Sequence, residues 1–166
     1  MDYKVSEIKL SPEIAGQKIR NWCAYQERSQ FDVRKKLSSL GVDEDNREAI
    51  IAQLIAENYI NEQRFADAFA GGKTRMKGWG RQKIKRELLQ HKVPDTIIRE
   101  TLSELNEAEY YERMQKLIEK KLQGQEKTDR RKVFASVYRF MLNKGYESEL
   151  VIKELNSQLG DIENES

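Results

Sequence analysis

Residues 83–93 read KIKRELLQHKV, and two other segments of the chain carry the same pattern of apolar positions. They are DVRKKLSSLGV at 32–42 and SVYRFMLNKGY at 136–146, each about 50 residues from the next. A further stretch of helical apolar periodicity follows each of them, at 49–55, 96–102 and 150–159. Recurrence at a regular spacing is the signature of a repeat protein, and a period near 3.6 residues indicates helices. The pattern therefore predicts a duplicated helical unit.

Local capping signals divide the chain into helices. Ser11 stands before Pro12, and Ser29 and Asn61 each precede an apolar-periodic stretch, as side chains that cap helix N-termini do. Each unit is shorter than about 55 residues, near the size at which a single core is only marginally stable, so neighbouring units should lean on one another. The signals predict an all-α protein of nine helices in three tandem three-helix repeats, at 11–58, 61–105 and 107–159, with an acidic tail at 160–166.

Three helix details follow from spacing and capping chemistry. Asp43 or Asp45 is expected to cap the third helix, and Thr128 the eighth. On the fourth helix, spacings of four, three and four residues predict one apolar face, made of Phe65, Phe69, Gly72 and Met76.

The composition favours helices and gives no sign of membrane insertion or export. Of 166 residues, 35% are charged, 38% are hydrophobic and two are proline. The chain has no run of about 18 apolar residues, and its N-terminus lacks the basic segment and apolar core of a secretory signal. The single cysteine, Cys23, cannot form an internal disulfide, which fits a reducing compartment. We expect a cytoplasmic protein, and a monomer by default because no oligomerisation surface stands out.

The net charge of +2 conceals strongly segregated blocks. Residues 73–92 hold eight Lys or Arg against one Glu, and residues 113–132 hold eight against three acids. Six acids stand against one base in each of three other blocks, at 43–62, 95–112 and 147–166. Segregation on this scale predicts two basic surfaces offered to an anionic partner. The alternative for either block is an ordinary solvated helix face.

Residues for catalysis or metal binding are scarce. His91 is the only histidine and Cys23 the only cysteine, so a Cys and His zinc site is excluded. A Cys–His dyad would need two residues that are expected in different repeats. The Gly-Trp-Gly at 78–80 lacks the Gly-Lys-Ser/Thr sequence of a phosphate-binding loop. We therefore expect a binding protein that is not an enzyme and needs no cofactor.

Two long segments resemble the RecX family of bacterial recombinase regulators. They are ERSQFDVRKKLSSLGV at 27–42 and IAQLIAENYINEQRFADAFAGGKTRMKGWGRQKIKRELLQHKV at 51–93. The resemblance is strongest in Tyr-Ile-Asn-Glu-x-Arg-Phe-Ala at 59–66 and Lys-Gly-Trp-Gly-x-x-x-Ile-x-x-Glu-Leu at 77–88. It covers residues 20–105 well, and the last third fits only by pattern and by position in the triplets.

Three positions depart from the family pattern. Ile60 stands where the family often has Leu, and Asn61 where it often has Asp; both changes are mild. Lys92 stands where the family often has Gly, so the end of that helix is expected to rely on Pro94.

The resemblance implies a fold and a role. RecX proteins are three tandem three-helix repeats in an elongated, curved molecule. They bind the filament that RecA forms on single-stranded DNA and inhibit its ATPase, strand-exchange and coprotease activities, within DNA repair, recombination and the SOS response. Whether this chain would cap filament ends or lie along the groove is left open by the sequence.

The basic blocks supply the candidate contacts. Phosphate contacts would be independent of sequence and strongly salt-dependent. Trp79 could stack on a base, or it could be a buried staple between the fourth and fifth helices. Candidate filament or nucleic-acid contacts are Lys73, Arg75, Lys77, Trp79, Arg81, Lys83, Lys85 and Arg86. A possible second contact, or else a solvated helix junction, consists of Lys120, Lys121, Lys127, Arg130, Arg131 and Lys132.

Two other functions are compatible with the same residues. A helix-turn-helix-like DNA-binding protein would place residues 81–91 in a major groove, although only Gln82 and Gln90 could address base edges. A helical adaptor without any nucleic acid is the second alternative, and it predicts no salt-dependent DNA affinity.

Overall fold

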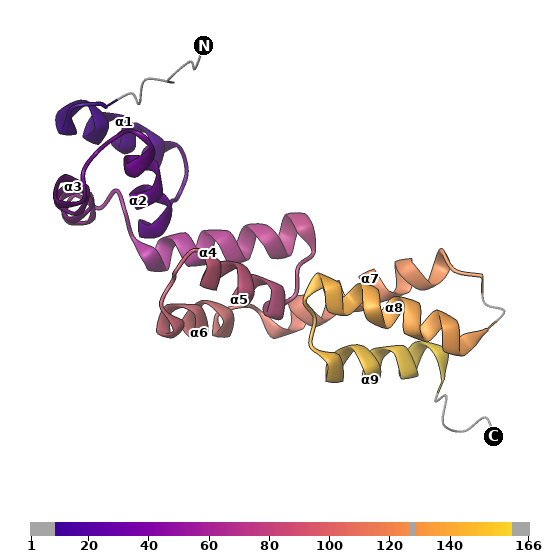
Figure 1. Ribbon diagram of the computed structural model, residues 1–166. Helices are drawn as coiled ribbons and strands as arrows, with labels where there is room; N and C mark the ends of the chain where they lie inside the picture. Colours follow the sequence, from indigo (N-terminus) through magenta and orange to yellow (C-terminus); the bar gives the residue numbers. More distant parts are fainter. Residues whose placement is uncertain (1–8, 127–128, 161–166) are drawn as a thin grey trace, which may run out of the picture.

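The computed structural model describes residues 9–126 and 129–160, which contain helices and no strand (Figure 1). Repeat 1 consists of α1 (Pro12–Tyr25), α2 (Gln30–Ser39) and α3 (Glu44–Ala56). Repeat 2 consists of α4 (Glu62–Gly72), the π-helix η1 (Lys73–Lys77), α5 (Arg81–Gln90) and α6 (Asp95–Ser103). Repeat 3 consists of α7 (Glu107–Gln123), α8 (Arg130–Lys144) and α9 (Ser148–Leu159).

The three repeats follow one another along an elongated, curved molecule, with the first and last repeats at opposite ends (Figure 1). The predicted all-α class and the tandem three-helix architecture are confirmed. We propose 11–58, 61–105 and 107–159 as the limits of the domains. Most of the predicted acidic tail, residues 161–166, lies outside the described residues. No helix of the described chain is long and apolar enough to cross a membrane.

Capping side chains begin the helices where the sequence predicted. Ser11, Ser29 and Asn61 each accept a hydrogen bond from a backbone N–H in the first turn, at 3.3, 3.0 and 2.8 Å. Asp43, and not Asp45, caps α3. Such caps typically stabilise a helix by about 1 kcal/mol, because they satisfy an otherwise orphaned donor.

The N-cap of α8 differs from the expectation. Asp129 accepts from the backbone N–H groups of Arg131 and Lys132, at 3.1 and 3.3 Å. The predicted cap, Thr128, lies outside the described residues.

Each repeat encloses its own hydrophobic core, and the recurring apolar positions lie in it. Burying each Leu, Ile or Val side chain contributes roughly 1.5–3 kcal/mol, so these positions explain why the pattern recurs. The equivalent buried residues are Val33, Ile84 and Val137; Leu37, Leu88 and Met141; and Val42, Val93 and Tyr146.

The turn before the last helix of each repeat has a left-handed backbone at the same position. Gly41, Lys92 and Gly145 have φ values of 77°, 58° and 98°. Only Lys92 carries a side chain there, so repeat 2 bears a backbone cost that glycine avoids in the other two. The sequence predicted that the end of this helix relies on Pro94. The structure shows that the helix end also depends on Lys92, which itself adopts the left-handed conformation.

The fourth helix does not continue as an α-helix to Met76, and the prediction of one apolar face is wrong at that residue. After Gly72 the chain forms the π-helix η1, in which each turn contains an extra residue. Thr74 of this segment donates from its hydroxyl to the carbonyl of Ala70 in α4 at 3.0 Å. The wider turn rotates Met76 out of the apolar face, and its side chain is 84% exposed.

Repeats 1 and 2 meet through side chains. Arg64 of α4 pairs with Glu27 at 2.5 Å, and His91 Nδ1 lies 2.8 Å from Asp32 Oδ2. The His91 ring also packs edge-on against Phe65. His91 therefore bridges the two repeats.

Candidate functional site

The basic segment begins in η1, where Lys73, Arg75 and Lys77 occupy a single widened turn. Arg75 and Lys77 are exposed, and Lys73 is half-buried. None of the three forms an ion pair with an acid of the described chain. A π-helical turn often marks a functional position, and this one presents positive charge without internal neutralisation.

Two of the predicted cations, Lys73 and Lys83, contact the ring of Trp79. Its ring meets Phe69 of α4 edge-on at 6.3 Å, so the indole packs between the fourth and fifth helices. The ammonium groups of Lys73 and Lys83 lie 4.9 and 4.3 Å from the ring centroid. Cation–π contacts of this kind hold an ammonium near an aromatic face. Lys73, Trp79 and Lys83 therefore form one cluster, which we call the Trp79 cluster; stacking of a base on Trp79 stays a prediction.

Helix α5 exposes two further cations. Lys85 and Arg86 are exposed and form no ion pair within the described part of the chain. They extend the positive surface beyond the Trp79 cluster, although no contact joins them to it.

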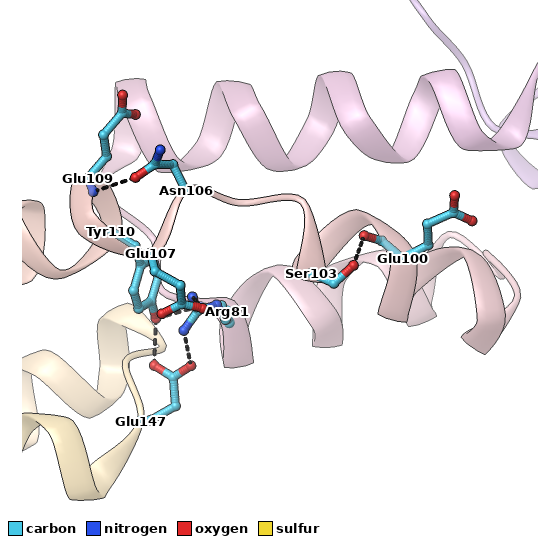
Figure 2. Close-up of polar contacts among 8 residues, drawn as sticks. All are labelled: Arg81, Glu100, Ser103, Asn106, Glu107, Glu109, Tyr110 and Glu147. Carbon is cyan, nitrogen blue, oxygen red and sulfur yellow. Dashed lines mark hydrogen bonds and ion pairs between the residues drawn. The ribbon is translucent and has the colours of Figure 1, made fainter.

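Arg81 does not belong to the open basic surface, because two carboxylates engage it (Figure 2). Its guanidinium lies 2.5 Å from Glu107 and 3.2 Å from Glu147, and only 15% of its side chain is exposed. The guanidinium carbon also lies 3.9 Å above the Tyr110 ring. Burial alone would lower the pKa of Arg81, but the hydrogen bonds to Glu107 and Glu147 outweigh it and raise that pKa. Arg81 thus joins repeats 2 and 3.

Tyr110 completes this polar network (Figure 2). Its hydroxyl accepts from the Arg81 backbone N–H at 3.0 Å and donates to Glu147 at 2.6 Å. Burial, together with the hydrogen bond to Glu147, raises the pKa of Tyr110 well above its ordinary value. The neutral phenol is therefore a fixed part of the junction, where it satisfies an orphan donor at the start of α5.

Two glycines allow the backbones of repeats 2 and 3 to touch. Gly80 N–H donates to the carbonyl of Lys144 at 2.8 Å, and Gln82 N–H donates to that of Gly145 at 2.9 Å. A Cβ added at Gly80 would lie 2.4 Å from the Gly145 carbonyl, and one added at Gly145 would lie 2.4 Å from Lys83 Cβ. No larger residue fits at either position without separating the repeats.

Repeat 3 also holds the end of η1. The Tyr146 hydroxyl donates to the Gly78 carbonyl and Lys144 Nζ donates to the Lys77 carbonyl, both at 3.0 Å. These repeat-3 residues were not among the predicted site residues. Their partners lie 67 and 68 residues away in sequence, so only the glycine at the close contact could have indicated them.

The second basic block is only partly open. Lys120, Arg131 and Lys132 are exposed, and Lys121 is half-buried. Arg130 lies against Gly160, where an added Cβ would come within 2.9 Å of its guanidinium. Lys127 lies outside the described residues.

Two family models match the chain. Residues 61–102 match the second three-helix domain of RecX, and residues 107–153 match its third three-helix domain. The chain belongs to the RecX family. The matched segments correspond to repeats 2 and 3, the two repeats that the glycine contact and the Tyr110 network join.

RecX relatives from three organisms align with most of this chain. The regulatory protein RecX of Clostridium botulinum (strain Eklund 17B / Type B) is 34% identical over 140 residues, covering 81% of this chain and 65% of the relative. That of Oceanobacillus iheyensis is 27% identical over 140 residues, covering 82% and 52%. That of Haemophilus influenzae (strain PittGG) is 28% identical over 132 residues, covering 79% and 86%. The chain therefore spans between half and two thirds of the length of the first two relatives.

Solved RecX structures share the fold. The crystal structure of RecX from Lactobacillus salivarius matches with a TM-score of 0.79 and 23% identity, over 88% of this chain and 95% of that chain. A crystal structure of another regulatory protein RecX matches with a TM-score of 0.76 and 21% identity, over 88% and 71%. These likenesses concern the fold of the RecX repeats, which this chain shares.

Proposed function

We propose that this RecX-family protein is a negative modulator of RecA that binds the RecA filament on single-stranded DNA. Binding inhibits the ATPase, strand-exchange and coprotease activities of the filament without catalytic chemistry on this chain. Family membership supports the choice of partner. The observation that carries the choice of surface is the Trp79 cluster with the exposed cations of η1, because unneutralised positive charge beside an aromatic ring suits an anionic strand or an acidic protein surface.

The elongated shape supports contact with several filament subunits at once. Repeats in a row can each make a modest contact, and linked contacts raise overall affinity without any single large interface. The backbone contact of Gly80 and Gln82 with Lys144 and Gly145, which we call the locked junction, joins repeats 2 and 3. It fixes the spacing of the basic surfaces on those repeats. Less ordering entropy is then lost on binding than with freely moving repeats.

Major-groove binding by residues 81–91 fits the structure less well. A helix-turn-helix protein reads base edges with the first residues of its recognition helix. Here the backbone of Gln82 and the side chain of Arg81 are already engaged by repeat 3. The Arg81 side chain is therefore held by repeat 3 at the position from which a recognition helix would read bases.

The test is single-strand-dependent ATP hydrolysis by RecA, with this protein added well below stoichiometry. The wild-type chain should inhibit, and K73E/K83E should need at least about tenfold more protein, because reversal removes both ammoniums of the Trp79 cluster and introduces repulsion. A matched control is K18E/K153E, which makes the same charge change at exposed lysines of repeats 1 and 3.

Circular dichroism of each variant establishes that helicity is retained. Unimpaired inhibition by folded K73E/K83E refutes the role of the Trp79 cluster. Absence of inhibition by the wild-type chain, even at equimolar protein, refutes the regulatory function itself.

A further inference from the structure

Repeat 3 carries a pocket of about 390 Å³ between α7 and α8. Leu117 and Phe140 form its apolar floor, and Lys120, Lys121 and Lys144 contribute its charged rim. Of the three rim lysines, Lys120 and Lys121 fall in the second basic block seen in the sequence, whereas Phe140 and Lys144 are brought to the pocket by the fold.

Two lysines of the rim contact the aromatic ring of the floor. The ammonium groups of Lys121 and Lys144 lie 4.4 and 5.8 Å from the centroid of Phe140. This repeats the arrangement of the Trp79 cluster, where two ammoniums flank an indole ring. None of the three rim lysines pairs with an acid of residues 9–126 or 129–160. The rim charge is therefore available to an anion.

The pocket directly adjoins the first basic surface. Lys144, which lines it, donates to the carbonyl of Lys77 in η1 at 3.0 Å. Leu117 of the floor lies against Gly78, where an added Cβ would come within 3.3 Å of it. The two predicted basic blocks, distant in sequence, thus meet at the junction of repeats 2 and 3.

We propose that this pocket binds a nucleotide unit of single-stranded nucleic acid. The base lies on the floor of Leu117 and Phe140, and the neighbouring phosphates contact the lysine rim. Aromatic platforms combined with a positive groove are how proteins bind single strands without sequence preference. An acidic peptide could pair with the lysines, but it would leave the apolar floor without a partner; a strand uses both. Because the strand is that of the RecA filament, this site rests on the proposed function and adds direct contact with the strand.

The test omits RecA and measures anisotropy of a fluorescent oligothymidylate titrated with the full chain, over a range of salt concentrations. K120Q/K121Q removes two phosphate contacts and should lower the slope of log affinity against log salt by about 1.4. At 0.1 M salt that slope change corresponds to roughly 25-fold weaker binding. F140L keeps an apolar floor but loses the aromatic face, and it should weaken binding at least about fivefold.

The control is K116Q/K153Q, which removes two exposed lysine charges from the same repeat without touching the pocket. If K120Q/K121Q and the control lose the same affinity for the oligothymidylate, the effect comes from overall charge alone, and the proposal is overturned. Unchanged binding by both pocket variants would overturn it as well, as would an oligonucleotide that fails to bind while polyglutamate does. RecA inhibition by the same proteins is scored separately, so the site can fail while the regulatory function stands.

Discussion

Substitution of Gly80 by alanine should break the contact between repeats 2 and 3. Gly80 has φ −84° and ψ 168°, a conformation that alanine adopts freely, so backbone strain contributes nothing. The new methyl group would lie 2.4 Å from the Gly145 carbonyl carbon and oxygen. Because backbone surrounds it and no flexible side chain can move aside, α5 must move away from the turn between α8 and α9.

The expected cost can be divided into two parts. Gly80 is the N-cap of α5, and alanine at an N-cap costs up to about 1 kcal/mol. Separation of the repeats breaks the hydrogen bonds from Gly80 to Lys144 and from Gln82 to Gly145, at about 1 kcal/mol each. The unfolding free energy should therefore fall by about 3 kcal/mol, and the two repeats should begin to unfold independently.

Urea unfolding followed by circular dichroism measures this loss. Gly124→Ala is the matched control, because its new methyl group would meet other atoms no closer than 3.7 Å. The control should change stability by less than about 1 kcal/mol, and it should keep a single transition. A loss of about 1 kcal/mol or less in Gly80→Ala, with one transition, would mean that only the cap was changed and would refute the locked junction.

Three other predictions concern single residues. Lys92→Gly should raise the unfolding free energy by about 0.5–1 kcal/mol in urea, since it relieves a left-handed backbone at some entropic cost, whereas Lys92→Ala should not. Burial raises the pKa of Cys23 to about 11, so at pH 8 a thiol reagent should label the native chain at least roughly 100-fold more slowly than the urea-unfolded chain; equal rates would contradict its burial. Tyr110→Phe should cost about 2–3 kcal/mol by removing the bonds to Glu147 and Arg81. Because the folded state raises the pKa of Tyr110, the contribution of this group to wild-type stability is full below a pH of about 10 and is lost as the pH rises above it. The fall in stability in alkaline urea titrations should therefore be smaller in the variant, where only the other groups with raised pKa values, such as Cys23 and Tyr146, still cause it.

Local features of the sequence were enough to predict most helices. The caps Ser11, Ser29 and Asn61 act on backbone groups within the next turn, so their effect is visible in a few consecutive residues. Apolar periodicity likewise identified residues that are buried in all three repeats, such as Leu37 and Leu88. These are short-range properties, and neighbouring residues determine them.

Contacts between repeats were not visible in that way. Arg81 looked like one more cation of a basic helix, but Glu107 and Glu147, which neutralise it, lie 26 and 66 residues away. The sequence therefore suggested Arg81 as part of the basic surface, whereas the structure places its guanidinium against two carboxylates. The pocket around Phe140 could not be predicted for the same reason, because its lining combines residues from α7, from the segment after it and from α8.

The π-helix has a consequence for the evolution of chain length. Its hydrogen bonds span five residues where an α-helix spans four, so deletion of one residue from 73–77 would let α4 continue as an ordinary helix. Each residue of an α-helix turns the chain by about 100°, and the exit toward Gly80 would swing by a comparable angle. The single additional residue thus sets the angle between α4 and α5 within repeat 2. We expect insertions and deletions in related chains to avoid this turn and to occur instead in the loop between α7 and α8.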